Sequence, residues 1–330
     1  MLNYILYFFP LADSFFVADM HLFEHCLSRK IQMLLDGKED YAGVIFHAET
    51  FLDGCSIELY SADKAILEQV SIDIEKFNFT EKDSFLIEEE RDLISVEILE
   101  LDLTEEEQTL YEIFKTIDSI DILELYSDNF SISSTEIGKL NDLLSNFNKV
   151  TFDGETLRKK KSPRKSFIRK NKTEIVNEKI IGYGLHSVYT LNELTNLLFF
   201  SYLFGRSQHA VIDKEYLKEF DLYLGYMMSL SYRNYFLVLL YMDTNDLLLG
   251  KYEKEKTIHS SNEEVYLSKR FVASFQTFIF YEDPMFLQLA KYYMKTDMQE
   301  ESLSIENFKE AVGNIDRDFL QQRLKEGFPC

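Results

Sequence analysis

The sequence has few cysteines, few prolines and no tryptophan, and it has no long apolar run. Its 330 residues include three cysteines, four prolines and twelve glycines. Cys26, Cys55 and Cys330 show no Cys-x-x-Cys spacing and cannot make a disulfide framework, which is typical of a reducing compartment. A membrane-spanning helix needs roughly eighteen or more consecutive apolar residues, and the absence of such a run excludes one.

The first sixteen residues are mostly apolar, but they lack a positively charged beginning and are interrupted by Pro10 and Asp13. We therefore predict neither a signal peptide nor a spanning helix there, and we expect a cytoplasmic protein. Basic residues are also scarce, because 35 Lys and Arg stand against 57 Asp and Glu, a net charge of −22. Since nucleic-acid backbones are bound by surplus Lys and Arg, this charge argues against nucleic acid and favours a basic or neutral peptide as partner.

Much of the basic charge lies in one segment. Residues 158–172 hold nine of the 35 basic residues and no acid. Like charges repel, so we expect a solvated connector or an exposed hairpin here, with a polyanion-binding patch as the alternative. The length of 330 residues and the 46% hydrophobic content suffice for two domains. We predict a first domain over residues 1–157, a basic linker over 158–176 and a second, related domain over 177–330.

Both predicted domains alternate strand-like and helix-like stretches. Helices are indicated by apolar residues at helical spacing and by capping residues, and strands by short runs of β-branched and aromatic residues. The expected strands are 4–9, 57–60, 179–183 and 235–241, and the expected helices are 16–35, 84–99, 104–117, 191–202, 263–280, 284–294, 305–312 and 316–325. This pattern predicts an α+β protein.

The helix expected over 16–35 contains His21-Leu22-Phe23-Glu24-His25. Residues four apart share a helix face, so His21 and His25 can direct two imidazoles at one ion, with Glu24 beside them. A hydrolytic zinc site needs three protein ligands and an open position for water, so a third ligand must come from elsewhere. The alternative is a chance cluster on a polar helix face.

The best candidates for the third ligand are carboxylates on the helix expected over 84–99. Glu90 and Glu97 lie seven residues apart, which is about two helical turns along one face. Around them are apolar residues expected to bury the helix, namely Leu93, Ile94, Val96 and Ile98. A carboxylate among apolar side chains is costly unless it is paired or bound to metal. The alternative is an ordinary amphipathic helix in an acidic protein.

The order of these motifs resembles the pitrilysin/insulinase family of inverzincin metallopeptidases, which includes the mitochondrial processing peptidases. In this chain the second motif, ERDLISVE, ends at Glu97, 72 residues after His25. The resemblance implies one Zn²⁺ per chain, with His21, His25 and Glu97 as ligands, Glu24 as general base and Glu90 as a carboxylate that supports catalysis. It also implies two related domains, each a mainly antiparallel sheet packed with helices, which together form one half of a clam-like enzyme.

Further matches concern substrate binding. The residues His47-Ala48-Glu49-Thr50 resemble the family's Asn-Ala-x-Thr edge strand, where an extended substrate adds to the sheet, with His47 in the position of the Asn. The residues Leu224-Gly225-Tyr226 resemble its Leu-Gly-Tyr, which implies a substrate-binding role for Tyr226. Family members place an Arg seven residues before that Tyr, and the pair grips the substrate. In this chain that position is Glu219.

The absence of an Arg at this position predicts that the metal ligands and the Arg/Tyr pair lie on two different subunits. Family enzymes close two halves around the substrate, and a chain of this length has room for one half. We therefore expect the zinc-bearing subunit of a heterodimer whose partner supplies the Arg/Tyr pair; the alternative is a homodimer in which Arg206 or Arg233 serves. The implied activity is zinc-dependent cleavage of peptides, a leader or precursor peptide by analogy with compact family members, and the alternative is a non-catalytic peptide-binding or assembly subunit.

Overall fold

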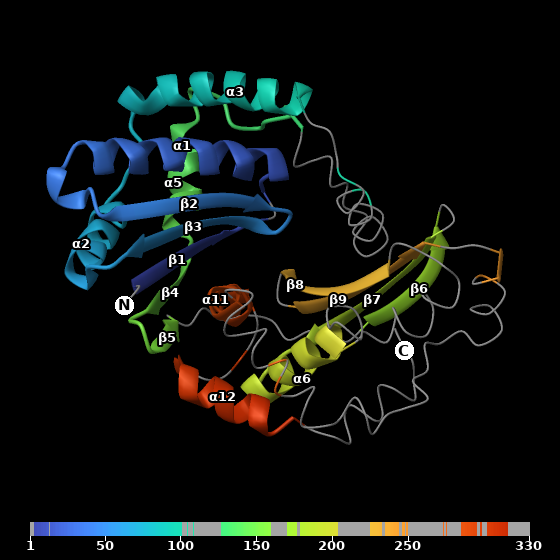
Figure 1. Ribbon diagram of the computed structural model, residues 1–330. Coiled ribbons are helices and arrows are strands. Elements are labelled where there is room, and N and C mark those ends of the chain that lie inside the picture. The colour runs from blue at the N-terminus through green and yellow to red at the C-terminus, as the bar shows by residue number, and fades with distance from the viewer. Residues whose placement is uncertain are drawn as a thin grey trace. The chain divides into compact units, whose positions relative to one another are not determined.

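The protein is described here from a computed structural model (Figure 1). Backbone and side chains are described for residues 3–12, 14–100, 104, 108, 127–159, 188–203, 246, 247, 249, 273, 275, 289–295, 298 and 302–315. The backbone alone is described for residues 170–176, 179–187, 225–232, 235–243 and 285–288. The chain divides into two compact units, Met1–Ser162 and Pro163–Cys330. Each unit contains an antiparallel sheet and helices that pack on it.

The sheet of the first unit has the strand order β5-β4-β1-β3-β2. Its strands are β1 (Asn3–Pro10), β2 (Val44–Phe51), β3 (Gly54–Ser61), β4 (Asn148–Phe152) and β5 (Thr156–Lys159). β1 pairs antiparallel with both β3 and β4, and all its residues except Pro10 are buried. A strand with both faces covered needs a continuous apolar run instead of alternation, which explains the sequence of β1. Pro10 ends the strand, because proline has no N–H to donate.

A tight turn joins β2 to β3. Gly54, the first residue of β3, has a φ of 147°, and a Cβ there would collide with the carbonyl oxygen of Phe9. Only glycine adopts this conformation without strain, so the turn and the strand pairing that follows it depend on Gly54. The resulting register places Thr50 opposite Cys55.

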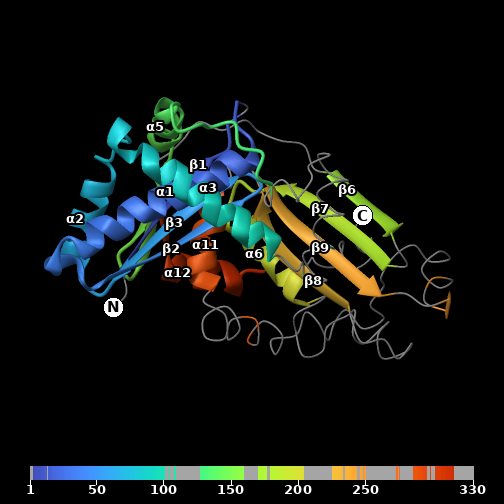
Figure 2. The same cartoon turned by 90° about the horizontal axis from the view of Figure 1, so that it is seen from above.

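Helices cover one face of this sheet in two layers (Figures 1 and 2). The helix α1 (Val17–Asp36) lies against β2 and β3, and α3 (Ser84–Leu99) lies on α1. The helices α2 (Lys64–Ile74) and α5 (Ile137–Ser145) contact β1, and short 3-10 turns, η1 (Glu39–Tyr41) and η2 (Glu81–Asp83), precede β2 and α3. The core between sheet and helices is apolar and includes Ile5, Tyr7, Phe9, Phe23, Leu27, Ile57, Leu86 and Leu140.

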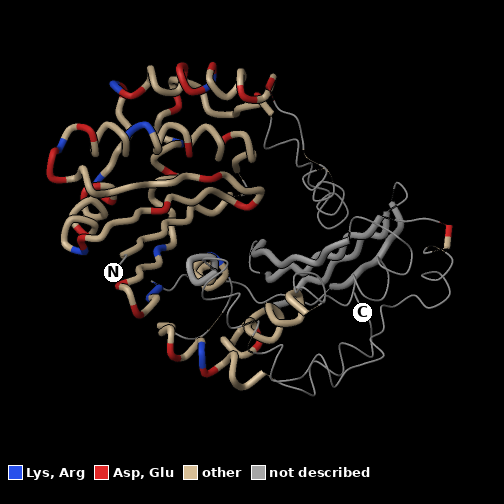
Figure 3. The backbone as a smooth tube through the Cα atoms, in the orientation of Figure 1, with Lys and Arg blue, Asp and Glu red and all other residues tan. Residues whose placement is uncertain are grey.

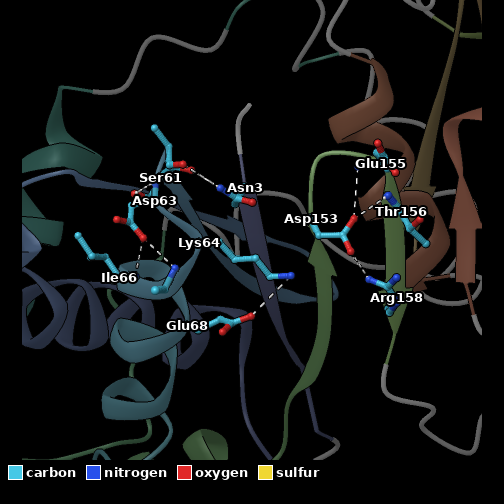
Figure 4. Close-up of polar contacts among 12 residues, drawn as sticks. Asn3, Ser61, Asp63, Lys64, Ile66, Glu68, Asp153, Glu155, Thr156 and Arg158 are labelled. Carbon is cyan, nitrogen blue, oxygen red and sulfur yellow. Dashed lines mark hydrogen bonds and ion pairs between the residues drawn. The ribbon is translucent and has the colours of Figure 1, made fainter.

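Side-chain oxygens satisfy backbone donors where elements begin (Figure 4). Asp63 Oδ1 accepts hydrogen bonds from the N–H groups of Ala65 at 2.8 Å and Ile66 at 3.2 Å, which caps α2. In the turn between β4 and β5, Asp153 Oδ1 accepts from the Thr156 N–H at 3.0 Å. The first N–H groups of a helix have no partner inside it, so such carboxylates fix where the chain enters the helix.

Lys30 connects α1 to the start of α3. Its Nζ lies 2.9 Å from Asp83 Oδ1, the last residue of η2, and 5.0 Å from the centroid of the Phe79 ring. The Lys30 and Asp83 side chains are 16% and 19% exposed. Because both charges are largely shielded from water, this ion pair is less screened than a surface pair. It helps set where α3 begins relative to α1.

The second unit contains a sheet with the strand order β6-β7-β9-β8. Its strands are β6 (Lys170–Val176), β7 (Lys179–Ser187), β8 (Gly225–Tyr232) and β9 (Tyr235–Asp243). The helices α6 (Leu191–Ser201) and α11 (Met285–Lys295) contact this sheet, and α12 (Ile305–Gly313), which follows the short strand β10 (Ser302–Ser304), packs on α6. Thr190 caps α6 by accepting from the Glu193 N–H at 3.2 Å, while Glu193 accepts from the Thr190 N–H at 3.0 Å.

The α+β prediction is confirmed. Residues 170–176, which fall in the segment expected as a basic linker, form β6, which pairs antiparallel with the next strand, β7, along its whole length. Of the two arrangements expected for the basic residues, this pairing agrees with a hairpin and not with a solvated connector. Strand pairing satisfies backbone groups that a solvated connector would leave to water, and it overrides the repulsion expected from the charge pattern. The expected helices 104–117, 263–280 and 316–325 lie almost entirely outside the described residues. In the described part of the chain, no helix is both long enough and apolar enough to cross a membrane.

Candidate metal centre

The helix α1 brings His21, Glu24 and His25 together. One ligand atom of each residue lies within 4.8 Å of the ligand atoms of the other two. The two imidazole rings meet edge to face, with centroids 4.8 Å apart. Between them in sequence, Leu22 and Phe23 are fully buried in the core. Burial of these two apolar residues fixes the rotation of α1, and this rotation sets the direction of the polar residues.

The helix α3 adds two carboxylates. Glu97 Oε2 lies 3.8 Å from His21 Nε2 and 3.6 Å from His25 Nε2. Glu90 Oε2 lies 3.2 Å from His25 Nδ1. Because Glu90 and Glu97 are about two turns apart on one helix face, α3 reaches both nitrogens of the His25 ring. Glu97 Oε2 therefore lies within 4 Å of the Nε2 atoms of both imidazole rings, on the side of α1 that faces α3.

The donor set fits a zinc ion. Zinc bonds to nitrogen and oxygen are about 2.0–2.2 Å long, so two ligand atoms on one tetrahedral ion are about 3.3–3.6 Å apart. The distances of 3.6 and 3.8 Å from Glu97 to the two histidines are close to this spacing. Glu90 contacts the other ring nitrogen of His25, Nδ1. A carboxylate that accepts a hydrogen bond from this second nitrogen fixes the tautomer and the orientation of a metal-binding histidine.

The two carboxylates of α3 differ in burial. The side chain of Glu90 is 6% exposed, whereas that of Glu97 is 56% exposed. The expectation that apolar neighbours bury Glu97 is wrong, because Leu93 and Val96 are both 52% exposed and only Ile94 of that stretch is fully buried. The helix packs on α1 through one face, and its flank points to solvent. The cost of burying a carboxylate therefore applies to Glu90, which is paired with His25.

Glu24 is the buried acid beside the imidazoles. It is 8% exposed, and it accepts hydrogen bonds from the Ser28 hydroxyl at 2.9 Å and from the Thr50 hydroxyl at 3.3 Å. Burial raises the pKa of Glu24, while the neighbouring His25 and the hydrogen bonds from Ser28 and Thr50 oppose the rise. A carboxyl group with a raised pKa is suited to take up a proton and release it again.

The predicted substrate-binding residues of the first unit lie on β2. This strand is last in its sheet order, so within the described strands it is an edge that pairs with β3 alone. Side chains alternate along it, so Ala48 and Thr50 face the helices while His47 and Glu49 face the other way. Thr50 joins the metal-centre residues through its bond to Glu24, whereas His47 is exposed.

Tyr226 belongs to the second unit. It is the second residue of β8 and pairs with Tyr241 of β9, and its backbone alone is described. β8 is the last strand of its sheet order. The residues weighed for the Arg position, Glu219, Arg206 and Arg233, lie outside the described residues.

Two residues donate hydrogen bonds to Glu24, and the sequence did not predict this role for either of them. Ser28 follows Glu24 by four positions on α1, so helical spacing alone could have indicated it. The sequence predicts Thr50 as a substrate-binding residue, whereas its bond to Glu24 depends on the packing of β2 against α1. No local sequence pattern predicts a hydrogen bond between a strand and a helix that are far apart in the chain.

The charge around the centre is negative. Figure 3 shows acidic residues along the length of α3. Besides the two site glutamates, these are Glu88, Glu89 and Asp92. A cluster of one sign raises the local concentration of the opposite charge, which favours a divalent cation and a basic peptide over an acidic one.

No protein-family model matches the chain, and no curated protein matches it by sequence. Solved structures do resemble it. A conserved protein from Enterococcus faecalis V583 has a TM-score of 0.58 at 12% identity, over 98% of this chain and 90% of that one. A putative M16-like peptidase from Alicyclobacillus acidocaldarius has a TM-score of 0.55 at 11% identity, over 98% of this chain and 90% of that one. A peptidase M16 inactive domain from Pseudomonas fluorescens has a TM-score of 0.51 at 9% identity, over 99% of this chain and 90% of that one. The chain therefore has the half-clam fold of M16-like, or pitrilysin-like, peptidases.

Proposed function

We propose that this chain is the zinc-bearing subunit of a zinc-dependent endopeptidase. The observation that carries the proposal is the convergence of His21 Nε2, His25 Nε2 and Glu97 Oε2, with distances of 3.8 and 3.6 Å from the glutamate to the two histidines. These three residues would hold one zinc ion per chain. Glu90 would hold His25 in the orientation that leaves Nε2 for the metal.

Bound zinc supplies Lewis-acid chemistry, because it polarises the scissile carbonyl and lowers the pKa of a water molecule. Glu24 would take a proton from the attacking water and pass it to the leaving amine. Ser28 and Thr50 hold its two carboxylate oxygens, so the base keeps one orientation while its charge changes.

We place the substrate along β2. An extended peptide added there would bond to backbone groups at the edge of β2, next to Thr50, which bonds to Glu24. Recognition through the main chain accepts many side chains but requires an unfolded segment. The surplus of acidic residues favours basic or neutral peptides. We therefore propose that the substrate is a leader or precursor peptide that is unfolded, is recognised through its main chain and is not acidic.

The proposal includes a second peptidase-like subunit. Where the resembling family has an Arg seven residues before Tyr226, this chain has Glu219. A carboxylate cannot donate hydrogen bonds to the substrate carbonyls as an Arg does. A partner subunit in a heterodimer would therefore supply the Arg/Tyr pair. The alternative is a homodimer in which Arg206 or Arg233 takes that role, and cleavage by the chain alone would favour it.

The test combines zinc stoichiometry with cleavage of a fluorescence-quenched peptide, by the chain alone and with its co-purified partner. We expect one zinc per chain and cleavage by the complex. Glu24→Gln should keep zinc and lose activity by about 10²–10⁴-fold, the usual contribution of a general base. Glu88→Gln, an exposed acid of α3, is the matched control and should keep both. Undiminished cleavage by zinc-loaded Glu24→Gln would overturn the assignment of the base, and absence of zinc from the wild-type chain would overturn the proposal.

A non-catalytic peptide-binding or assembly subunit is the second candidate. It is favoured by one structure of this fold that is described as an inactive domain. Against it stands the joint presence of His21, His25, Glu97 and a buried Glu24, since a subunit without chemistry has no need for ligands and base together. Peptide binding without cleavage, in zinc-loaded complexes with every co-purified partner, would favour this second function.

A further inference from the structure

Asp19 is a buried carboxylate to which the proposed chemistry assigns no role. It is the third residue of α1, two positions before His21, and it is 0% exposed. Its Oδ1 accepts from the N–H groups of Ser131 at 2.7 Å and Ile132 at 3.1 Å. Its Oδ2 accepts from the Ser131 hydroxyl at 2.6 Å and from the Phe16 N–H at 3.0 Å. Only the bond from Phe16 belongs to the helix cap; the other three hold a segment more than a hundred positions away.

We call this segment the strap and define it as residues 127–136, which lead into α5 and are green in Figure 1. Next to the two residues bound by Asp19, the strap carries Phe130. The guanidinium carbon of Arg91 lies 5.0 Å from the centroid of the Phe130 ring. Arg91 follows Glu90 on α3. The strap therefore contacts α1 through Asp19 and α3 through Phe130.

From these contacts we infer that Asp19 is a positioning residue for the candidate metal centre, an inference that rests on the function proposed above. The centre needs atoms from two helices, and its geometry follows from their separation. Lys30 and Asp83 join the helices near the start of α3, and the strap joins them beside Glu90. Ligand distances in metal sites tolerate deviations of only about 0.2 Å, so a small displacement of α3 is enough to weaken the site.

The chemistry of Asp19 explains why this position needs a carboxylate. All four groups that bond to Asp19 are hydrogen-bond donors, and a carboxylate provides only acceptors. In Asp19→Asn one oxygen becomes an NH₂ group. In one orientation it faces the N–H groups of Ser131 and Ile132, and in the other it replaces the oxygen that accepts from the Phe16 N–H and the Ser131 hydroxyl, so each orientation loses at least one bond that the strap donates. The substitution keeps the shape of the side chain and changes only its hydrogen bonding.

A purely structural role for Asp19 gives a different expectation. If the residue only capped α1, its loss would lower stability and leave the affinity of the folded protein for metal unchanged. A matched control is Asp63, whose carboxylate also starts a helix of this unit through two backbone hydrogen bonds. Asp63→Asn removes the charge of this cap but keeps an oxygen that accepts both bonds, so it should change the melting temperature of the metal-free protein only slightly and leave the metal centre unaltered.

The experiment measures zinc affinity by competition with a chelator, and the visible spectrum after cobalt substitution, in wild type, Asp19→Asn and Asp63→Asn. We expect Asp19→Asn to bind zinc about 10–100-fold more weakly, the usual effect of losing a residue that orients metal ligands, and to alter the cobalt spectrum. Asp63→Asn should match wild type in both. Ser131→Ala, which removes one of the three long-range bonds, should shift affinity in the same direction by less. Wild-type zinc affinity in folded Asp19→Asn would overturn the inference.

Hydrogen exchange of the metal-free proteins separates this inference from the proposed function. In Asp19→Asn the amides of α3 should exchange faster than in wild type, while in Asp63→Asn they should not. Unchanged exchange of α3 in Asp19→Asn would overturn the positioning role. If the wild-type chain binds no zinc, the proposed metal centre fails, and the exchange of α3 still decides whether Asp19 positions that helix.

Discussion

The two helices that form the candidate metal centre are held in different ways. Ten of the 20 residues of α1 are buried, whereas α3 buries four of its 16. The helix α1 lies between the sheet and α3, so core packing fixes the positions of His21, Glu24 and His25. The outer helix α3 packs on it through Leu86, Ile87 and Ile94, and further contacts through Lys30 and the strap hold it in place. The histidine pair therefore depends on the core, and the third ligand depends on contacts between helices.

The largest effect should come from His25→Ala, because this ring contacts a carboxylate through each nitrogen. We expect complete loss of zinc binding, together with lower stability of the metal-free protein, since buried Glu90 loses its partner. Glu97→Gln should weaken zinc binding with little loss of stability, because Glu97 is 56% exposed. Zinc stoichiometry and thermal melting of the metal-free variants test this pair. Equal destabilisation by both substitutions would contradict the contrast between the helices.

The second prediction concerns stability alone. Leu22→Ala removes a side chain that is 0% exposed between two site residues of α1, and it should cost about 2–5 kcal/mol of unfolding free energy. Leu93→Ala truncates a side chain of α3 that is 52% exposed, and it should cost less than about 1 kcal/mol. Urea unfolding of the metal-free proteins measures both. A large cost at Leu93 would show that α3 is packed as tightly as α1.

The third prediction tests how α3 orients a ligand of α1. Glu90→Gln keeps the shape of the side chain but weakens the charge-assisted contact with His25 Nδ1. We expect zinc affinity to fall by about 10–100-fold, which corresponds to about 1.4–2.7 kcal/mol. Glu89→Gln, the exposed neighbour on the same helix, is the control and should bind zinc like wild type. Identical affinities in both variants would remove Glu90 from the centre.

The smallest effect should be a shift in pH dependence. Because Glu24 acts as a base only when ionised, cleavage should fall as pH drops through the pKa of Glu24. Thr50→Val removes a hydrogen bond that lowers the pKa of Glu24, so the acid limb of the profile should move to higher pH. Profiles of kcat for both proteins test this. A shift to lower pH would contradict the assigned role of Thr50.

The raised pKa of Glu24 has a consequence for the metal-free protein. A carboxyl whose pKa is higher in the folded than in the unfolded state binds its proton more tightly when folded. The contribution of Glu24 to the free energy of unfolding should therefore decrease as pH rises from the unfolded-state pKa to the raised folded-state pKa. Glu24→Gln should remove this component, and unfolding measured across that pH range in both proteins checks it.

The elements that the sequence predicted best are those with strong periodicity. The helix expected over 84–99 coincides with α3, and the strand expected over 4–9 lies inside β1. Several short elements were not predicted, namely α2, α5, β4, β5, β6 and β8. In α5, which has nine residues including Gly138, the helical period repeats too few times to stand out. Such segments take their structure from the sheet and core that they pack against.

At the candidate site, the sequence by itself determined the side chains whose relation is local. The spacing of His21, Glu24 and His25 on one helix follows from helical geometry, as does the two-turn separation of Glu90 from Glu97. Only the tertiary structure decided that these two helices lie against each other, that Thr50 reaches Glu24 from a strand, and that Asp19 holds a segment 112 residues away. Local geometry is set by backbone dihedral angles within a few residues. Contacts across such sequence distances depend on how the whole core packs, which no short pattern encodes.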